Sequence, residues 1–182
     1  MIMKAEKSNT LVKTVLTALF ASLCCVATMV IQIPTPTGGF LNLGDAVVVL
    51  SAFFLGPVYG SLAAGLGSAL ADIFAGYAQY APATFAIKAL MAVCVWAVLR
   101  LFKNITDRKP KLSFLFTATG ALFAEILMVL GYLLFEWVIL GYGAGAVASV
   151  PANAMQGVAG IVAGTLLTEL LKKTKLKEKF LN

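Results

Sequence analysis

The sequence predicts an all-α integral membrane protein, a bundle of six transmembrane helices with both termini in the cytoplasm. Three observations support this fold class. Hydrophobic residues make up 60% of the 182 residues, charged residues make up 12%, and the mean hydropathy is +0.94. Soluble domains are typically about a quarter charged. The short connections leave no room for a soluble domain, so residues 1–182 are expected to form one transmembrane domain.

Six apolar segments follow one another along the chain. A helix needs about 20 apolar residues to cross a bilayer, and segments near this length lie at 11–33, 58–76, 83–102, 113–136 and 150–171. A further segment, 45–56, is short for a full crossing. Gly56 and Pro57 separate it from the next segment, because proline breaks a helix.

Positive charge gathers at three places and predicts the orientation. Three lysines precede or open the first segment, five basic residues surround the connection between the fourth and fifth, and five lysines follow the sixth. With six crossings these places share one side, and the positive-inside rule makes that side cytoplasmic. The connections 34–44, 77–82 and 137–149 hold no Lys or Arg and are expected outside. Topology thus explains the net charge of +6, and no nucleic-acid partner is expected.

The first outer connection, 34–44, is expected to be irregular. The stretch QIPTPTGGFLNLG holds two prolines and three glycines, so its backbone cannot continue as a regular helix. Non-helical backbone at membrane depth must be covered by protein or line a wet cavity. Long irregular connections are often functional, so this segment is either a lid over a cavity or a plain turn.

Small residues recur at four-residue spacing on two segments. On 58–76 this stripe is expected to serve close helix packing within the chain. On the cytoplasmic half of 11–33 a similar stripe consists of Thr14, Ala18 and Ser22. This second stripe either packs within the chain or docks the helix of a partner protein.

Three ionisable residues, Asp72, Lys88 and Glu125, lie within apolar segments. Each costs about 2.5–3.5 kcal/mol at a helix centre, and such residues usually face a cavity or a partner. Asp72 and Lys88 lie near the outer ends of their segments, where they could meet as an ion pair that fixes helix register or belong to a binding site. Glu125 could be the floor of a pocket, a partner of Lys88, or a neutral buried carboxyl.

Further polar residues gather on the predicted outer side. Asn153 and Gln156 share a helix face at the start of 150–171, where they either bind a ligand or satisfy backbone groups near Pro151. The inner half holds little beyond its flanking charges, which predicts a pocket that opens outward. Its candidate substrate-binding residues are Asn42, Asp45, Asp72, Gln79, Tyr80, Lys88, Glu125, Asn153 and Gln156.

The residue types argue against catalysis and metal binding. The chain has no histidine, its three cysteines lie inside apolar segments without metal-ligand spacing, and no nucleophile arrangement is recognisable. A G-x-x-x-x-G-K-[ST] phosphate-binding loop is also absent from the sequence. No enzyme activity, metal or cofactor is therefore expected. A stand-alone channel or secondary transporter is an alternative that predicts inner polar residues as well.

Two stretches resemble a known family. The stretch NLGDAVVVLSAFFLGPVYGSLAAGLGSALADIFAGYAQYAPATFAIKALMA closely resembles the second to fourth helices of the substrate-binding S components of energy-coupling factor (ECF) vitamin transporters. The likeness rests on the ordered motifs N-L-G-D, L-G-P, A-L-A-D and Y-A-P-A-T-F-x-I-K. The later VPANAMQGVAGIVAG looks like the start of their sixth helix, although Ala152 stands where a glycine is expected.

The resemblance implies a six-helix subunit of a prokaryotic plasma membrane that captures a vitamin or its precursor from outside. Uptake would then require a transmembrane coupling protein and two cytoplasmic ATP-hydrolysing subunits. In that family small residues of the first helix contact the coupling protein, which favours Thr14, Ala18 and Ser22 as this interface. The sequence looks most like the group for pyridoxine, hydroxymethylpyrimidine and related small heteroaromatic compounds, with riboflavin and pantothenate binders as related alternatives.

Overall fold

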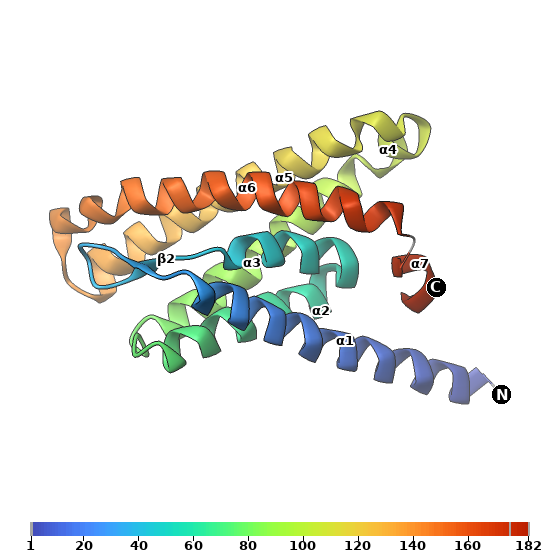
Figure 1. Cartoon of the computed structure of the whole chain (residues 1–182), viewed down its shortest axis with the longest axis horizontal. Helices are drawn as coiled ribbons and strands as arrows, with labels where there is room; N and C mark the ends of the chain where they lie inside the picture. Colours follow the sequence, from blue (N-terminus) through green and yellow to red (C-terminus); the bar gives the residue numbers. More distant parts are fainter. Residues whose placement is uncertain (1, 175, 182) are drawn as a thin grey trace.

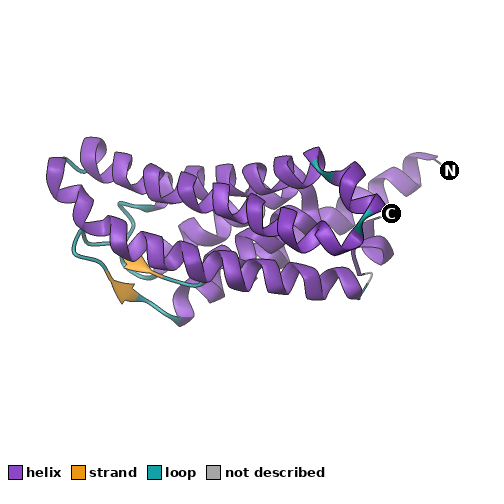
Figure 2. Ribbon diagram, turned by 90° about the horizontal axis from the view of Figure 1, so that it is seen from above, coloured by secondary structure: helices purple, strands orange, loops and turns teal. Residues whose placement is uncertain are grey.

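Long helices dominate the computed structural model, which describes residues 2–174 and 176–181. They run side by side along the long axis of the molecule (Figures 1 and 2). The long helices are α1 (Ile2–Val30), α2 (Gly44–Phe74), α3 (Ala81–Leu101), α5 (Ser113–Leu134) and α6 (Val150–Lys173). Two short helices, α4 (Lys103–Arg108) and α7 (Leu176–Leu181), lie at one end of the bundle (Figure 1).

Five stretches of the described chain are long and apolar enough to cross a membrane. The prediction of an all-α membrane bundle is therefore confirmed. The predicted segments 45–56 and 58–76 fall within one helix, α2, except for residues 75 and 76. Figure 1 shows the start of α1 and α7 at the same end of the bundle, as an even number of crossings requires. Six crossings and cytoplasmic termini stay predictions.

The helix α2 folds back on itself at Gly56, as the Gly-Pro break predicts. Gly56 has φ 79° and ψ −167°, a conformation that glycine adopts without steric cost. Ser51 Oγ donates a hydrogen bond of 3.2 Å to the carbonyl of Gly60, so residues on either side of the break meet. The first arm, 44–55, is about 18 Å long at 1.5 Å per residue, shorter than the roughly 30 Å hydrocarbon layer.

Small residues bring the second arm of α2 against α1. A Cβ atom on Gly67 would lie 2.3 Å from the carbonyl oxygen of Ala21 and 2.8 Å from the Cβ of Cys24. Ser68 Oγ lies 3.3 Å from Cys24 Sγ. These contacts confirm that the small residues of segment 58–76 serve packing within the chain.

The stripe on α1 has a different environment. Thr14, Ala18 and Ser22 are all exposed. The hydroxyl groups of Thr14 and Ser22 donate to carbonyls of their own helix, at 3.0 Å and 2.9 Å. The stripe therefore does not pack against another described helix, and its use as a partner interface stays a prediction.

The connection after α1 forms a short β-hairpin (orange in Figure 2). Strands β1 (Ile33–Pro34) and β2 (Phe40–Leu41) pair antiparallel, with Ile33 opposite Leu41. The hairpin end of the bundle lies opposite the end that carries α7 (Figure 1). At the hairpin end, α5 continues into the π-turn η2 (Phe135–Ile139), and the 3-10 helix η3 (Gly143–Ser149) leads into α6.

The apolar core fills the middle of the bundle. It lies between α2, α3 and α5, and its most deeply buried members include Val48, Val49, Met91, Val95 and Met128. The outer faces of the long helices carry exposed Leu, Val, Ile and Phe side chains instead. This distribution is typical of a protein whose perimeter contacts lipid.

Candidate functional site

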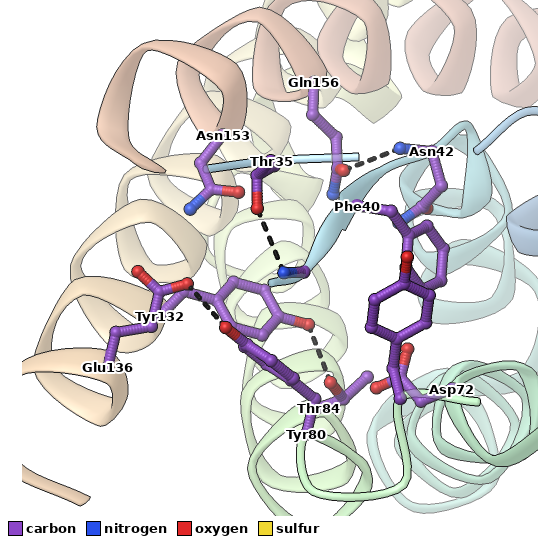
Figure 3. Close-up of a pocket in the computed structure, with 12 residues that line it drawn as sticks. Thr35, Phe40, Asn42, Asp72, Tyr80, Thr84, Tyr132, Glu136, Asn153 and Gln156 are labelled. Atoms are coloured by element: carbon purple, nitrogen blue, oxygen red, sulfur yellow. Dashed lines mark hydrogen bonds between the residues drawn. The ribbon is translucent and has the colours of Figure 1, made fainter. Parts of the chain in front are cut away.

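A small polar cavity lies beneath the hairpin (Figure 3). Its volume is about 30 Å³, room for only about two or three water molecules. Side chains from the hairpin and from α2, α3, α5, η2 and α6 meet around it. The lining residues are Thr35, Gly39, Phe40, Asn42, Asp72, Tyr77, Tyr80, Thr84, Tyr132, Glu136, Asn153 and Gln156.

Four aromatic rings form much of the cavity wall. The ring centroids of Phe40 and Tyr77 are 4.8 Å apart. Those of Tyr80 and Tyr132 are 6.4 Å apart. Such rings can cover the faces of a flat ligand, while the tyrosine hydroxyls supply polar contacts.

Glu136 is the most strongly hydrogen-bonded carboxylate of the cavity. Its side chain is 2% exposed. Thr37 Oγ1 donates to its Oε1 at 2.9 Å, and Ser149 Oγ donates to its Oε2 at 2.5 Å. The structure pairs no described Lys or Arg with this group. Hydroxyl donors from the hairpin and from η3 therefore hold Glu136 in the wall.

Tyr80 links the hairpin to the helices. Its Oη lies 2.9 Å from the carbonyl oxygen of Thr37 and 3.2 Å from Glu136 Oε1, and it can donate to either. Burial, followed by the charge of Glu136, raises the pKa of the Tyr80 phenol above its ordinary value. The phenol therefore remains a donor, and its hydrogen bond to Thr37 closes the hairpin over the cavity.

A second polar layer lies directly below the cavity. The ammonium of Lys88 pairs with Asp45 Oδ1, and Gln156 Nε2 donates to Asp45 Oδ2 at 2.6 Å. Gln156 Oε1 accepts from the backbone N–H of Asn42 at 2.8 Å. The same Lys88 Nζ lies 5.6 Å from the centroid of the Tyr132 ring. Gln156 and Tyr132 thus connect this buried ion pair to the cavity wall.

Of the two alternatives for Asp72 and Lys88, the mutual ion pair is not formed, because Lys88 pairs with Asp45. The rotation of the helices about their axes explains the difference, since the start of α2 packs beside α3 with Asp45 directed toward Lys88. Asp72 instead lines the cavity, where its Oδ2 is buried without a hydrogen-bond partner among the described residues. This oxygen can accept a hydrogen bond from a ligand.

Glu125 lies beside the lower layer, near Asp45, but outside the cavity lining. It is 3% exposed, and neither carboxylate oxygen has a hydrogen-bond partner in the described part of the chain. A Cβ atom on Gly160 would lie 2.3 Å from its Oε1, so the glycines of α6 provide the space for this side chain. Glu125 borders a groove between α5 and α6 that is lined mainly by apolar residues, and it does not line the cavity.

The structure brings together five of the nine candidate binding residues around the cavity, Asn42, Asp72, Tyr80, Asn153 and Gln156. Asp45 and Lys88 lie one layer below it. Gln79 is exposed on the turn between α2 and α3 and, like Glu125, is absent from the lining.

The sequence interpretation left Glu136 outside the candidate set. A usable signal existed, because Glu136 is the only charged residue between Glu125 and Glu169, and a carboxylate within so long an apolar stretch indicates a function. Phe40 and Thr84 carry no comparable signal, since such residues are common in helices and loops of any membrane protein.

A family model described as "ECF-type riboflavin transporter, S component" matches residues 8–173. The chain belongs to this family. A protein of Pyrococcus woesei, described as "Uncharacterized protein in gap 3'region", is 39% identical over 150 residues. The matched region covers 81% of this chain and 93% of the relative.

Membership confirms the resemblance of the sequence to ECF S components. The protein is thus a substrate-binding subunit of an ECF transporter and a multi-pass protein of the cell membrane. The family is one of transport subunits rather than enzymes. ECF S components work with a membrane coupling protein and ATPases and bind a small vitamin.

Proposed function

We propose that this S component captures a small heteroaromatic vitamin or precursor, of the pyridoxine or hydroxymethylpyrimidine type, from outside the cell. The observation that supports this is the combination of four aromatic rings with amide, carboxyl and hydroxyl groups around one cavity. Ligand sites typically join an apolar wall to a few convergent polar groups.

The chemistry of the lining suits a flat ring with hydroxyl and ring-nitrogen substituents. The rings of Phe40 and Tyr132 offer apolar faces, and Asn153 supplies an amide that can both donate and accept. The unpartnered Oδ2 of Asp72 accepts from a ligand hydroxyl or ring N–H. Glu136 already accepts hydrogen bonds from the hydroxyl groups of Thr37 and Ser149 and shapes the wall.

The volume of the cavity indicates that the hairpin must move. Drug-sized ligands occupy pockets of roughly 300–1,000 Å³. The present cavity, at about 30 Å³, is at least about tenfold smaller. We propose that segment 34–44 acts as a lid that opens for the ligand and closes behind it. A single small ring requires less opening than a tricyclic flavin does.

Riboflavin is the second candidate ligand. The description of the matching family names it, and its ring system would also use the aromatic wall. Pantothenate, an acyclic compound, makes less use of these rings.

Transport would need partner subunits. The described chain is proposed to work with a transmembrane coupling protein and two cytoplasmic ATPases, because the sequence has no phosphate-binding loop of its own. The exposed stripe of Thr14, Ala18 and Ser22 is the proposed contact with the coupling protein. The ATPases would act on the side where the charge pattern places both termini.

The test is a titration of the purified full chain with pyridoxine, hydroxymethylpyrimidine, riboflavin and pantothenate, followed by native mass spectrometry. One small heteroaromatic molecule per chain is the expected result. Asn153→Ala should weaken its affinity by about tenfold, since losing a buried hydrogen bond costs about 1–3 kcal/mol. The matched control Asn104→Ala alters an exposed residue of α4 and should leave affinity unchanged.

Two outcomes would contradict the proposal. If none of the four compounds binds and the isolated protein carries a proton- or ion-driven flux, the secondary-transporter alternative replaces it. If Asn153→Ala binds as tightly as the parent, the ligand lies elsewhere.

A further inference from the structure

A second and larger cavity lies at the α7 end of the bundle. Its volume is about 620 Å³. It is bordered by the broken end of the first α2 arm, by α3, α4, α5 and α6, and by α7. Its lining residues are Ala52, Phe53, Trp96, Leu99, Arg100, Lys103, Thr106, Asp107, Pro110, Ser113, Lys172, Lys177 and Glu178.

Positive charge prevails in this cavity. Arg100, Lys103, Lys172 and Lys177 face two acidic residues, Asp107 and Glu178. Neither carboxylate forms an ion pair with any of these cations within the described chain. An anion would therefore find an excess of positive charge.

Two of the lysines are fixed by the fold. Lys177 Nζ donates at 2.6 Å to the carbonyl of Phe53, near the end of the first α2 arm, and lies 4.6 Å from the centroid of its ring. Lys172 Nζ lies 5.0 Å from the same centroid and pairs with Glu169 at 2.6 Å. Burial, together with the charges of Lys172 and Lys103, lowers the pKa of Lys177. A bound anion would relieve this repulsion.

Arg100 and Lys103 are free to bind. Both are exposed, and neither takes part in an ion pair among the described residues. They lie where α3 passes into α4. Arg100 and Lys103, beside Lys177 and the Glu169-paired Lys172, form a site whose excess positive charge can hold a phosphate group.

The cavity lies where the apolar stretches end. Candidate membrane spans stop at Leu101 and Lys173 and begin again at Pro110, so the cations lie at the level of lipid headgroups. Trp96 and Leu99 give the cavity an apolar wall beside its charges. The neighbouring Leu101 is 74% exposed, as expected of a residue that contacts acyl chains.

We infer that this cavity binds the phosphate headgroup of an anionic phospholipid from the cytoplasmic leaflet. Basic pockets between transmembrane helices on the cytoplasmic side are suited to such headgroups. The assignment to the cytoplasmic leaflet rests on the proposed orientation of the subunit. The inference does not depend on which vitamin the subunit binds. The site would anchor α4 and α7 to the membrane surface.

The test uses the fluorescence of Trp96 in the full chain carrying Trp137→Phe, because these are the two tryptophans. The protein in neutral detergent is titrated with short-chain phosphatidylglycerol and, separately, with phosphatidylcholine. Saturable binding of phosphatidylglycerol, about tenfold tighter than that of phosphatidylcholine, is expected. Added salt should weaken it.

Arg100→Gln together with Lys103→Gln should weaken phosphatidylglycerol binding by about thirtyfold, because each of the two cations near a membrane surface contributes about 1 kcal/mol. The matched control, Lys109→Gln with Lys111→Gln, removes the same charge from exposed residues outside the cavity and should bind as the parent does. Circular dichroism and vitamin binding check that both double variants fold.

Three results would overturn the inference. The first is equal affinity for the two lipids, and the second is competition by inorganic phosphate at the lipid's own concentration, which would indicate a soluble ligand. The third is that the Arg100→Gln, Lys103→Gln variant binds lipid as the parent does but fails to assemble with the coupling protein. This result would indicate that the cavity is a docking site for a protein.

Discussion

Asp45 and Lys88 form a buried ion pair within the bundle, and Gln156 completes their hydrogen bonding. Both side chains are at most 2% exposed. A buried pair of this kind contributes modest net stability, whereas the loss of one partner leaves an uncompensated charge in an apolar medium. These residues therefore act together, and they support the cavity from below.

Asp45→Asn and Lys88→Met should each lower the free energy of unfolding by about 3–5 kcal/mol. The double variant should be more stable than either single variant, because no buried charge remains unpaired. Thermal unfolding in detergent, followed by tryptophan fluorescence, measures the effect. Asp107→Asn, at an exposed position, serves as the control, and additive losses in the double variant would contradict the expectation.

Tyr80→Phe should release ligand about fivefold faster than the parent, since one neutral hydrogen bond contributes about 1 kcal/mol. The substitution removes the donor that holds the hairpin carbonyl of Thr37. Because the pKa of Tyr80 is raised, the phenol stays protonated at neutral pH and loses its proton only as the pH rises well above 10. The parent rate should thus be constant between about pH 7 and 9.

A chase with unlabelled ligand in stopped flow gives these rates. Tyr142→Phe is the matched control, because Tyr142 is 46% exposed at the same end of the bundle. Equal rates for Tyr80→Phe and the parent would show that the hairpin does not control release.

Helix breaks decide which side chains reach the cavity. Because of the fold-back at Gly56, the first arm of α2 supplies Asp45 to the layer below the cavity and the second arm supplies Asp72 to the cavity wall. The π-turn η2 ends α5 in a way that leaves Glu136 buried while the next residue, Trp137, is 47% exposed. Single π-helical turns such as η2 are frequent at functional sites.

Gly67→Ala should destabilise the protein by about 1–3 kcal/mol through overpacking. The added methyl group meets the backbone of α1 at Ala21, which cannot rotate away. Gly145→Ala is the control, since a Cβ there meets nothing within 4 Å and the residue does not have a positive φ. Equal thermal midpoints for the two variants would mean that α1 shifts to accommodate the methyl group without loss of stability.

Ala18→Trp should leave vitamin binding unchanged but reduce ATP-driven uptake by about tenfold or more, because a large ring separates helices that small residues bring together. Ala97→Trp on the exposed face of α3 is the matched control. Uptake is measured with radiolabelled vitamin in proteoliposomes that hold the complete transporter. Parental uptake by Ala18→Trp would exclude α1 as the interface with the coupling protein.

The helical bundle was largely predictable from the sequence, because the hydropathy and flanking charge of a whole segment determine whether it forms a membrane helix. Segment lengths predicted the helices, and Gly-Pro predicted the fold-back at Gly56. Side-chain partners were less accessible. The sequence gives the depth of a residue along its helix, which placed Asp72 and Lys88 at one level. It does not give the rotation of each helix about its axis, which depends on packing. That rotation directs Lys88 toward Asp45. The same rotation directs Glu125 toward α6 rather than into the cavity.

Membrane orientation is testable with single cysteines. In intact cells, Gln79→Cys at the hairpin end should react with a membrane-impermeant maleimide, and Asn104→Cys on α4 should react only after permeabilisation, because basic flanks stay inside. Both positions are exposed. The native cysteines are buried or half-buried within helices, and the parent measures their background. Labelling of Asn104→Cys in intact cells would show that the predicted orientation is wrong and that α4 lies outside.

The apolar layer between the two cavities also has an electrical consequence. Val48, Val49, Met91 and Val95 are fully buried there, so an ion crossing between the cavities would have to give up its water shell at a prohibitive free energy. We therefore expect the resident subunit to act as an insulator. A cell could then hold many copies of the subunit in its membrane without dissipating the membrane potential.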